Sequence, residues 1–238
     1  MNLLVVEAHP QYAGMFISGT LYKHIQHGDQ VTVVALSDAE GLTNLKPMNE
    51  IGETNKQEML AAAEIIGLKD IRFWGSPDTY IQNTHQLRLE VNHLIREVKP
   101  DVIITHWPND TLSDLRETGM AAIDAAFNAL LVTGKWVEKL PSHWTSKMYG
   151  FQHPGLSLGF KPTTFVDISD VIEIKIKALD CFKIQIEANF GNDIEKWRSF
   201  VLGPNRYWGL ESGVMYAEPF GQLEIHEVHN KAMNLLIP

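Results

Sequence analysis

The first half of the chain alternates short apolar runs with longer segments of helical periodicity, and this alternation constrains the fold more than any other feature. Leu3–Glu7 and Val31–Leu36 are short runs of apolar and β-branched residues, as is typical of buried parallel strands. Glu53–Ile66 instead repeats its apolar residues at steps of three and four, and Gly67 follows as a helix stop. Strands that alternate with helices predict an α/β fold, with a mostly parallel sheet flanked by helices.

The same patterns define the predicted elements and one domain spanning residues 1–238. The predicted strands are Leu3–Glu7, Val31–Leu36, Ile71–Trp74, Val102–Thr105, Met148–Phe151 and Thr164–Val166, and the predicted helices are Met15–His27, Glu53–Ile66, Leu87–Val98, Arg116–Leu131 and Val171–Ile186. The segment Asn189–Gly213 is rich in Gly, Asn and aromatic residues, and it indicates a surface lid or an interface.

Charge and cysteine content exclude several classes of protein. The 29 acidic and 20 basic residues give a formal net charge of −9, which opposes binding to a nucleic-acid backbone. Cys181 is the single cysteine, so an internal disulfide and a Cys-rich zinc site are both excluded. The N-terminus lacks the pattern of a signal peptide, and no apolar run is long enough to cross a membrane. We expect a cytoplasmic protein with a small-molecule substrate.

Polar residues follow three of the predicted strands. Ligands of parallel α/β sheets bind beyond the carboxyl ends of the strands, so the segments 8–14, 37–44 and 106–115 are the ones to inspect. They contain several side chains that we expect to converge in one cleft: His9, Asp38, Glu40, His106, Asp110 and Asp114. Imidazole and carboxylate groups suit proton transfer and also zinc binding, although each of these residues also has a purely structural explanation.

Several catalytic motifs are absent from the sequence. No GxGxxG follows the first strand, and GxxxxGK[ST], HExxH and CxxC do not occur. Dinucleotide binding and P-loop chemistry therefore lose their main support.

The sequence resembles the PIG-L/LmbE (GlcNAc-PI de-N-acetylase-like) family of zinc-dependent N-deacetylases over nearly its whole length. The matching stretches are AHP after the first strand, GTL at 19–21, VTVVALSDAEG at 31–41, PDVIITH at 100–106, FVDIS at 165–169 and YAEPF at 216–220. The resemblance implies a Rossmann-like core over residues 1–135. It also implies an extension over 136–238 that completes the site and offers an interface.

The family's zinc motif is only partly matched. In the family, AHPDD provides a His ligand, a general base and an Asp ligand, and a later HPDH provides a second His ligand. Here His9 matches the first ligand of the motif, whereas Gln11 occupies the position of the general base and Tyr12 that of the Asp ligand. Leu115 stands at the last His. The resemblance therefore implies that the zinc site is lost and that no cofactor is needed. The alternative is zinc held by His9 with substitute ligands from His106, Asp110 or Asp114.

The resemblance leans toward the 4-oxalomesaconate hydratase-like branch of the family. The features are the segment 37–40, FQHP at 151–154 and KPTTFVDI at 161–168. In that branch a glutamate and a histidine form the acid/base pair, which implies these roles for Glu40 and His153. Arg206 is the first candidate to anchor a substrate carboxylate, and Arg116 competes with it.

The sequence and the resemblance together favour a zinc-free enzyme that uses general acid/base chemistry on a small polar metabolite, either carboxylated or sugar-like. Hydration, dehydration, isomerisation and hydrolysis remain open. The predicted catalytic residues are His9, Glu40, Asp114 and His153, and the predicted substrate-binding residues are Gln11, Tyr12, Asp38, His106, Asp110, Arg116 and Arg206. The alternatives are a zinc-dependent deacetylase or hydratase with substitute ligands, and a non-catalytic binding protein. The family's habit implies a homo-oligomer.

Overall fold

The computed structural model describes residues 1–41, 46–131, 140–145 and 147–223, and it contains one seven-stranded sheet. The strands are β1 (Asn2–Glu7), β2 (Gln30–Ser37), β3 (Asp70–Ser76), β4 (Val102–His106), β5 (Lys147–Phe151), β6 (Thr164–Asp167) and β7 (Ala217–Gln222). Their order in the sheet is β3-β2-β1-β4-β5-β7-β6. The first five strands in that order pair in parallel, and β7 pairs antiparallel with both β5 and β6. The predicted α/β fold is confirmed.

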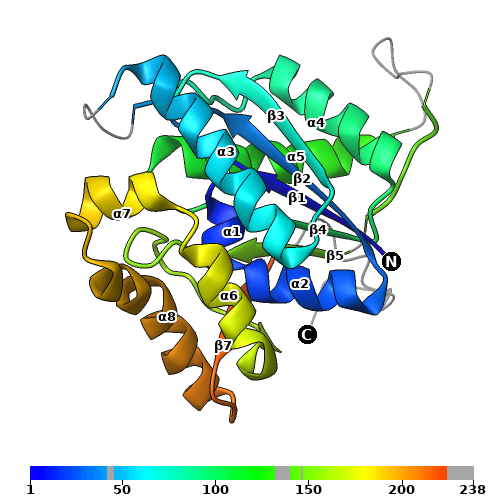
Figure 1. Ribbon diagram of the computed structural model, residues 1–238. Helices are drawn as coiled ribbons and strands as arrows, with labels where there is room; N and C mark the ends of the chain where they lie inside the picture. The colour runs from blue at the N-terminus through cyan, green and yellow to red at the C-terminus, as the bar shows by residue number, and fades with distance from the viewer. Residues whose placement is uncertain (42–45, 132–139, 146, 224–238) are drawn as a thin grey trace.

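Helices cover both faces of the sheet. In chain order they are α1 (Tyr12–Phe16), α2 (Ser18–His27), α3 (Met48–Ile66), α4 (His85–Val98), α5 (Ser113–Ala129), α6 (Ile172–Leu179), α7 (Lys183–Phe190) and α8 (Ile194–Glu211), with a short 3₁₀ turn at Ser169–Val171. Figure 1 shows α2 and α3 in front of the sheet and α5 behind it. The strand order runs from β1 to β2 and β3 on one side and from β4 to β5 on the other, so it reverses between the adjacent strands β1 and β4. Parallel α/β sheets bind ligands at such a switch point, beyond the carboxyl ends of the strands.

The core is built on the central strands. Leu3, Leu4, Val5 and Val6 of β1 are all at most 1% exposed, because neighbouring strands flank them and helices cover both faces. Burial of a side chain of this size stabilises a fold by roughly 1.5–3 kcal/mol. The unbroken apolar run that predicted a buried strand is thus the run that the sheet encloses.

The helix predicted over Met15–His27 is in fact two helices, α1 and α2, which break at Ile17. A buried ion pair explains the break. Lys175 Nζ donates to the carbonyl oxygens of Met15 and Phe16 and lies 2.6 Å from Glu218 Oε1. The Glu218 carboxylate in turn accepts from the backbone N–H groups of Gly19 and Thr20. Two distant side chains therefore satisfy the backbone groups that a helix interruption exposes.

The second half differs from the prediction in two further places. The helix predicted over Val171–Ile186 is divided into α6 and α7 by a turn at Asp180–Phe182. Most of the segment Asn189–Gly213, which indicated a surface lid or an interface, is helix α8, and this helix buries Trp197 and Val201 against the core. Among the described helices, none is both long and apolar enough to span a membrane.

Candidate functional site

The loop after β1 is fixed from two sides. The Ala8 N–H donates to His106 Nε2 at the end of β4, at 2.9 Å, and the Ala13 N–H donates to Glu7 Oε2 at 2.6 Å. Glu7 is fully enclosed, and burial raises the pKa of its carboxyl to about 8. The chain that carries His9 therefore leaves the sheet in a defined direction.

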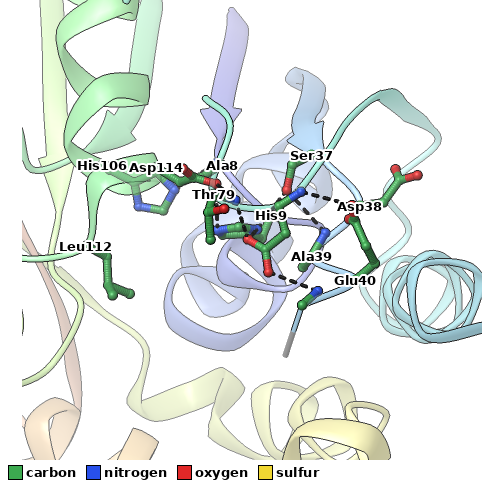
Figure 2. Close-up of polar contacts among 12 residues, drawn as sticks. Ala8, His9, Ser37, Asp38, Ala39, Glu40, Thr79, His106, Leu112 and Asp114 are labelled. Atoms are coloured by element: carbon green, nitrogen blue, oxygen red, sulfur yellow. Dashed lines mark hydrogen bonds and ion pairs between the residues drawn. The ribbon is translucent and has the colours of Figure 1, made fainter. Parts of the chain in front are cut away.

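Three side chains surround the His9 imidazole. Its Nδ1 lies 2.8 Å from Ser37 Oγ and 3.6 Å from Asp78 Oδ1, and its Nε2 lies 3.7 Å from Asp114 Oδ2. Figure 2 shows the ring between the end of β2, which carries Ser37, and Asp114. Burial lowers the pKa of His9 to about 4, although the Asp78 carboxylate opposes this shift. The ring is therefore neutral near pH 7.

Backbone amides position the two carboxylates. Asp114 stands in the first turn of α5, and its Oδ2 accepts from the Thr79 N–H at 2.8 Å. Asp78 follows β3, and its Oδ2 accepts from the Gly41 N–H at 3.1 Å. Burial raises the pKa of Asp114, and the charge of Asp78 adds to this rise. With one ligating atom taken from each of His9, Asp78 and Asp114, the three atoms lie within 4.8 Å of one another, close enough to share one metal ion.

These groups open into a cavity of about 220 Å³. Its lining residues are His9, Gln11, Tyr12, Ala39, Asp78, Thr79, Leu112, Ser113 and Asp114. None of these described lining residues is a lysine or an arginine. The volume suits a small polar molecule or part of a larger one.

The zinc ligand set implied by the family resemblance does not match the side chains at this site. Leu115 is fully buried within the hydrophobic core and has no ligating atom. Burial raises the pKa of Tyr12 above its usual value, so its phenol stays protonated and is a poor zinc ligand. His9 is the remaining member of that set.

The structure brings four of the predicted site residues to the cavity: His9, Gln11, Tyr12 and Asp114. Glu40 is not among the lining residues, but it contacts one of them: its Oε1 accepts from the Asp78 N–H at 3.0 Å. Asp38 pairs with Lys56 at 2.8 Å rather than facing the cavity lining. His106 holds the Ala8 N–H, and burial lowers its pKa.

The remaining predicted residues are not among those that line the cavity. His153 lies behind Tyr12, with ring centroids 5.5 Å apart, and burial lowers its pKa. Asp110 accepts from the Leu112 N–H and from the Ser157 hydroxyl. Arg116 donates to the Asp110 carbonyl oxygen, and Arg206, on α8, donates to that of Met215. These contacts place Asp110 and Arg116 beside the site and Arg206 on another element.

Asp78 and Thr79 are the site residues that sequence reasoning missed. Both follow β3, whose carboxyl end lies at the same edge of the sheet as those of β1 and β2. The rule that selected the segments after the first, second and fourth strands also applies to the third. Inspection of the segment after β3 would have found an aspartate.

Comparisons with known proteins agree with this architecture. A family model described as PIG-L, GlcNAc-PI de-N-acetylase, matches residues 4–126, about half of the chain. Diacetylchitobiose deacetylase of Thermococcus kodakarensis is 29% identical over 226 residues, covering 91% of this chain and 81% of the relative. The 4-oxalmesaconate hydratase of Pseudomonas putida is 26% identical over 189 residues, covering 76% of this chain and 72% of the relative.

A solved structure shares the fold. N,N'-diacetylchitobiose deacetylase of Pyrococcus horikoshii superposes with a TM-score of 0.78 at 24% identity, covering 94% of this chain and 84% of that one. The two relatives of known activity are a deacetylase and a hydratase, which supports an enzyme of hydrolase or lyase type. Because the family model covers more than half of its residues, the chain belongs to the PIG-L family.

Proposed function

We propose that this protein is a hydrolase that removes the acetyl group from an acetylated amino group of a small, uncharged, sugar-like compound, and that it does so in the His9 cavity without the family's own zinc ligand set. The similarity to diacetylchitobiose deacetylase supports the reaction class. The cavity supports the choice of substrate.

The charge of the cavity lining carries this proposal. Two carboxylates, Asp78 and Asp114, line the cavity, and its lining includes no lysine or arginine among the described residues. A substrate with several carboxylates would find no basic side chain in this lining to pair with, even if a divalent cation offsets the two aspartates. A neutral acetamido sugar needs no basic partner and offers hydroxyl and amide donors to the Asp78 and Asp114 oxygens.

The lining residues can divide the work of amide hydrolysis. A water molecule held between the His9 ring and the two carboxylates would attack the acyl carbon while one carboxylate accepts its proton. The Tyr12 hydroxyl and the Gln11 side-chain amide are donors at the cavity and would stabilise the oxyanion that develops. The carbon–nitrogen bond then breaks, and the proton returns to the leaving nitrogen, so that acetate and a free amine are released.

A second candidate is hydration of a carbon–carbon double bond. The similarity to 4-oxalmesaconate hydratase favours it, and the same held water would serve as its nucleophile. A carboxylated substrate would lack a basic partner among the described lining residues, so this candidate fits the cavity less well.

A two-armed assay tests the proposal. Purified protein is incubated with acetylated amino sugars, including diacetylchitobiose, and separately with 4-oxalomesaconate, while acetate release and loss of the double bond are followed. We expect acetate release, and a kcat/KM at least about a hundredfold lower in His9→Ala. The control His27→Ala removes a side chain that is 77% exposed on α2, and it should retain full activity.

Three outcomes contradict the proposal. Turnover of 4-oxalomesaconate alone would replace it with the hydratase. Acetate release that survives His9→Ala would place the chemistry elsewhere. No turnover of either substrate class would favour a non-catalytic binding protein.

A further inference from the structure

The cavity offers oxygen acceptors that lack donors. Asp114 is 3% exposed, and its Oδ1 is buried with no hydrogen-bond partner in the described structure. Gln11 also lines the cavity, and its Oε1 is likewise buried without a hydrogen-bond partner in the described structure. A buried acceptor without a donor costs roughly 1–3 kcal/mol, so a cation or a donor placed beside these two cavity oxygens would be stabilised.

The same place holds two negative side chains and an imidazole within a few ångströms. Asp78 Oδ1 and Asp114 Oδ2 lie 3.6 and 3.7 Å from the two nitrogens of the His9 ring. One ligating atom from each of the three residues lies within 4.8 Å of the other two, whereas ligands about 2.1 Å from a tetrahedral ion are about 3.4 Å apart, so the side chains would have to close by about 1 Å to hold an ion. The cationic groups nearby are engaged elsewhere, since Lys56 pairs with Asp38 and Arg116 bonds the Asp110 carbonyl oxygen.

Contacts around the three side chains also match those of metal ligands. Ser37 Oγ, at 2.8 Å, engages Nδ1 of His9, and this leaves Nε2 directed toward Asp114. The Thr79 N–H donates to Asp114 Oδ2 and the Gly41 N–H donates to Asp78 Oδ2, so backbone amides fix the orientation of both carboxylates. Ligands held in this way by a second layer of hydrogen bonds are typical of metal sites.

We infer that His9, Asp78 and Asp114 form a binding site for a divalent transition cation, Zn²⁺ or Mn²⁺, that is distinct from the ligand set implied by the family's motif. One imidazole and two carboxylates suit both cations, and three protein ligands leave a position open to water. Asp78 and Asp114 here take the place of the side chains that Tyr12 and Leu115 do not provide. The inference rests on the proposed function, because a cation in this cavity would polarise the water or the acyl oxygen of the proposed hydrolysis.

Calorimetric titration tests the site without reference to activity. Chelator-treated full-length protein, freed of chelator, is titrated with ZnCl₂ and separately with MnCl₂. We expect one site per chain for at least one of the two cations, and the tighter of the two identifies the cation. Asp78→Asn and Asp114→Asn should each weaken binding at least about tenfold. The control Asp124→Asn changes a carboxylate on the same helix that pairs with Asn83 and Arg88, and it should leave binding unchanged.

The variants are checked for folding by circular dichroism and thermal melting. The Asp78 side chain is 17% exposed, so Asp78→Asn is expected to fold. This variant still tests the site if Asp114→Asn, at a more buried position, does not fold. Absence of binding by both cations, or binding that Asp78→Asn does not weaken, would overturn the inference. Acetate release that depends on His9 without any bound cation would overturn the inference alone, whereas tight binding without turnover would overturn the proposed function alone.

Discussion

Leu115 and Leu112 show how neighbouring positions of one motif acquire different roles. Leu115 is fully buried in the core, whereas Leu112 is 41% exposed at the cavity. The resemblance identified position 115 as the place of a lost ligand, but burial shows what the new side chain does. Here the apolar residue stabilises α5 against the sheet, and α5 carries Asp114.

We predict that Leu115→Ala lowers the free energy of unfolding by about 2–5 kcal/mol, because it leaves a cavity in a close-packed region. Leu112→Ala is the matched control, and it should cost less than about 1 kcal/mol because the side chain is half-exposed. Urea denaturation measures both values. Equal losses for the two variants would contradict the different roles assigned to them.

Side-chain identity alone predicted His9 and Asp114 as site residues but not the partners that position them. Both lie in segments that follow parallel strands, whose carboxyl ends meet at one edge of the sheet, and both line the cavity. Ser37, Thr79 and Gly41 act through a hydroxyl or a backbone N–H, which any sequence position offers. Such contacts depend on the paths of three separate loops, so the residue types could not predict them.

Helix α5 packs closely against the end of β4 at Gly119. A Cβ placed there would lie 2.6 Å from the carbonyl oxygen of His106 and 3.2 Å from Cα of Pro108, and both are backbone atoms that cannot swing aside. Glycine at this position therefore lets the helix that carries Asp114 pack against the strand that carries His106.

We predict that Gly119→Ala costs about 1–3 kcal/mol of stability and also lowers turnover, because α5 must shift away from β4. Gly203→Ala, on α8, is the control, since nothing lies within 4 Å of its added Cβ and alanine favours helices. The control should be as stable as the parent protein or more so. A neutral Gly119→Ala in thermal melting would show that the contact between α5 and β4 tolerates the change.

Helices α3 and α7 meet through a carboxylate. Glu58 accepts from the Ile184 N–H at 3.0 Å in the first turn of α7, and burial raises the pKa of Glu58 to about 7. The unfolded chain releases this proton near pH 4.5, so between about pH 4.5 and 7 the folded state binds more protons than the unfolded state. Ionisation of Glu58 therefore reduces stability as the pH rises through this window.

We predict that the parent protein loses more stability than Glu58→Gln when the pH rises from 5 to 8, by about 1–3 kcal/mol after allowance for the partial exposure of the group. Glutamine keeps an oxygen that can accept from the Ile184 N–H, so the variant removes the ionisation with little loss of the contact. Chemical denaturation of both proteins at the two pH values gives the comparison. A parallel decline in the two proteins would contradict the assignment.

Elements in the first half of the chain were more predictable than those in the second half. Strands β1, β2 and β4 follow from apolar runs, and α3 and α4 from helical spacing, because burial inside a parallel sheet leaves a local mark on the sequence. The break between α1 and α2 depends on Lys175 and Glu218, which lie far away in the sequence. No local pattern records such a pair.

Across the full chain, one sheet joins the two halves. β5, β7 and β6 of the second half extend the parallel sheet of the first half, and α6 packs on α1, α2 and α3. Figure 1 shows α6, α7 and α8 gathered at one side of the sheet. The cavity itself is lined only by described residues between positions 9 and 114, so the second half supports the site from behind Tyr12.

We propose that the His9 cavity is the reaction centre and that it holds a cation through ligands other than the family's zinc set. A crystal structure of protein soaked in zinc, with diffraction measured on both sides of the zinc absorption edge, tests this proposal. We expect one strong anomalous peak about 2.0–2.2 Å from atoms of His9, Asp78 and Asp114. A cavity without zinc density, or zinc bound by other side chains, would contradict it.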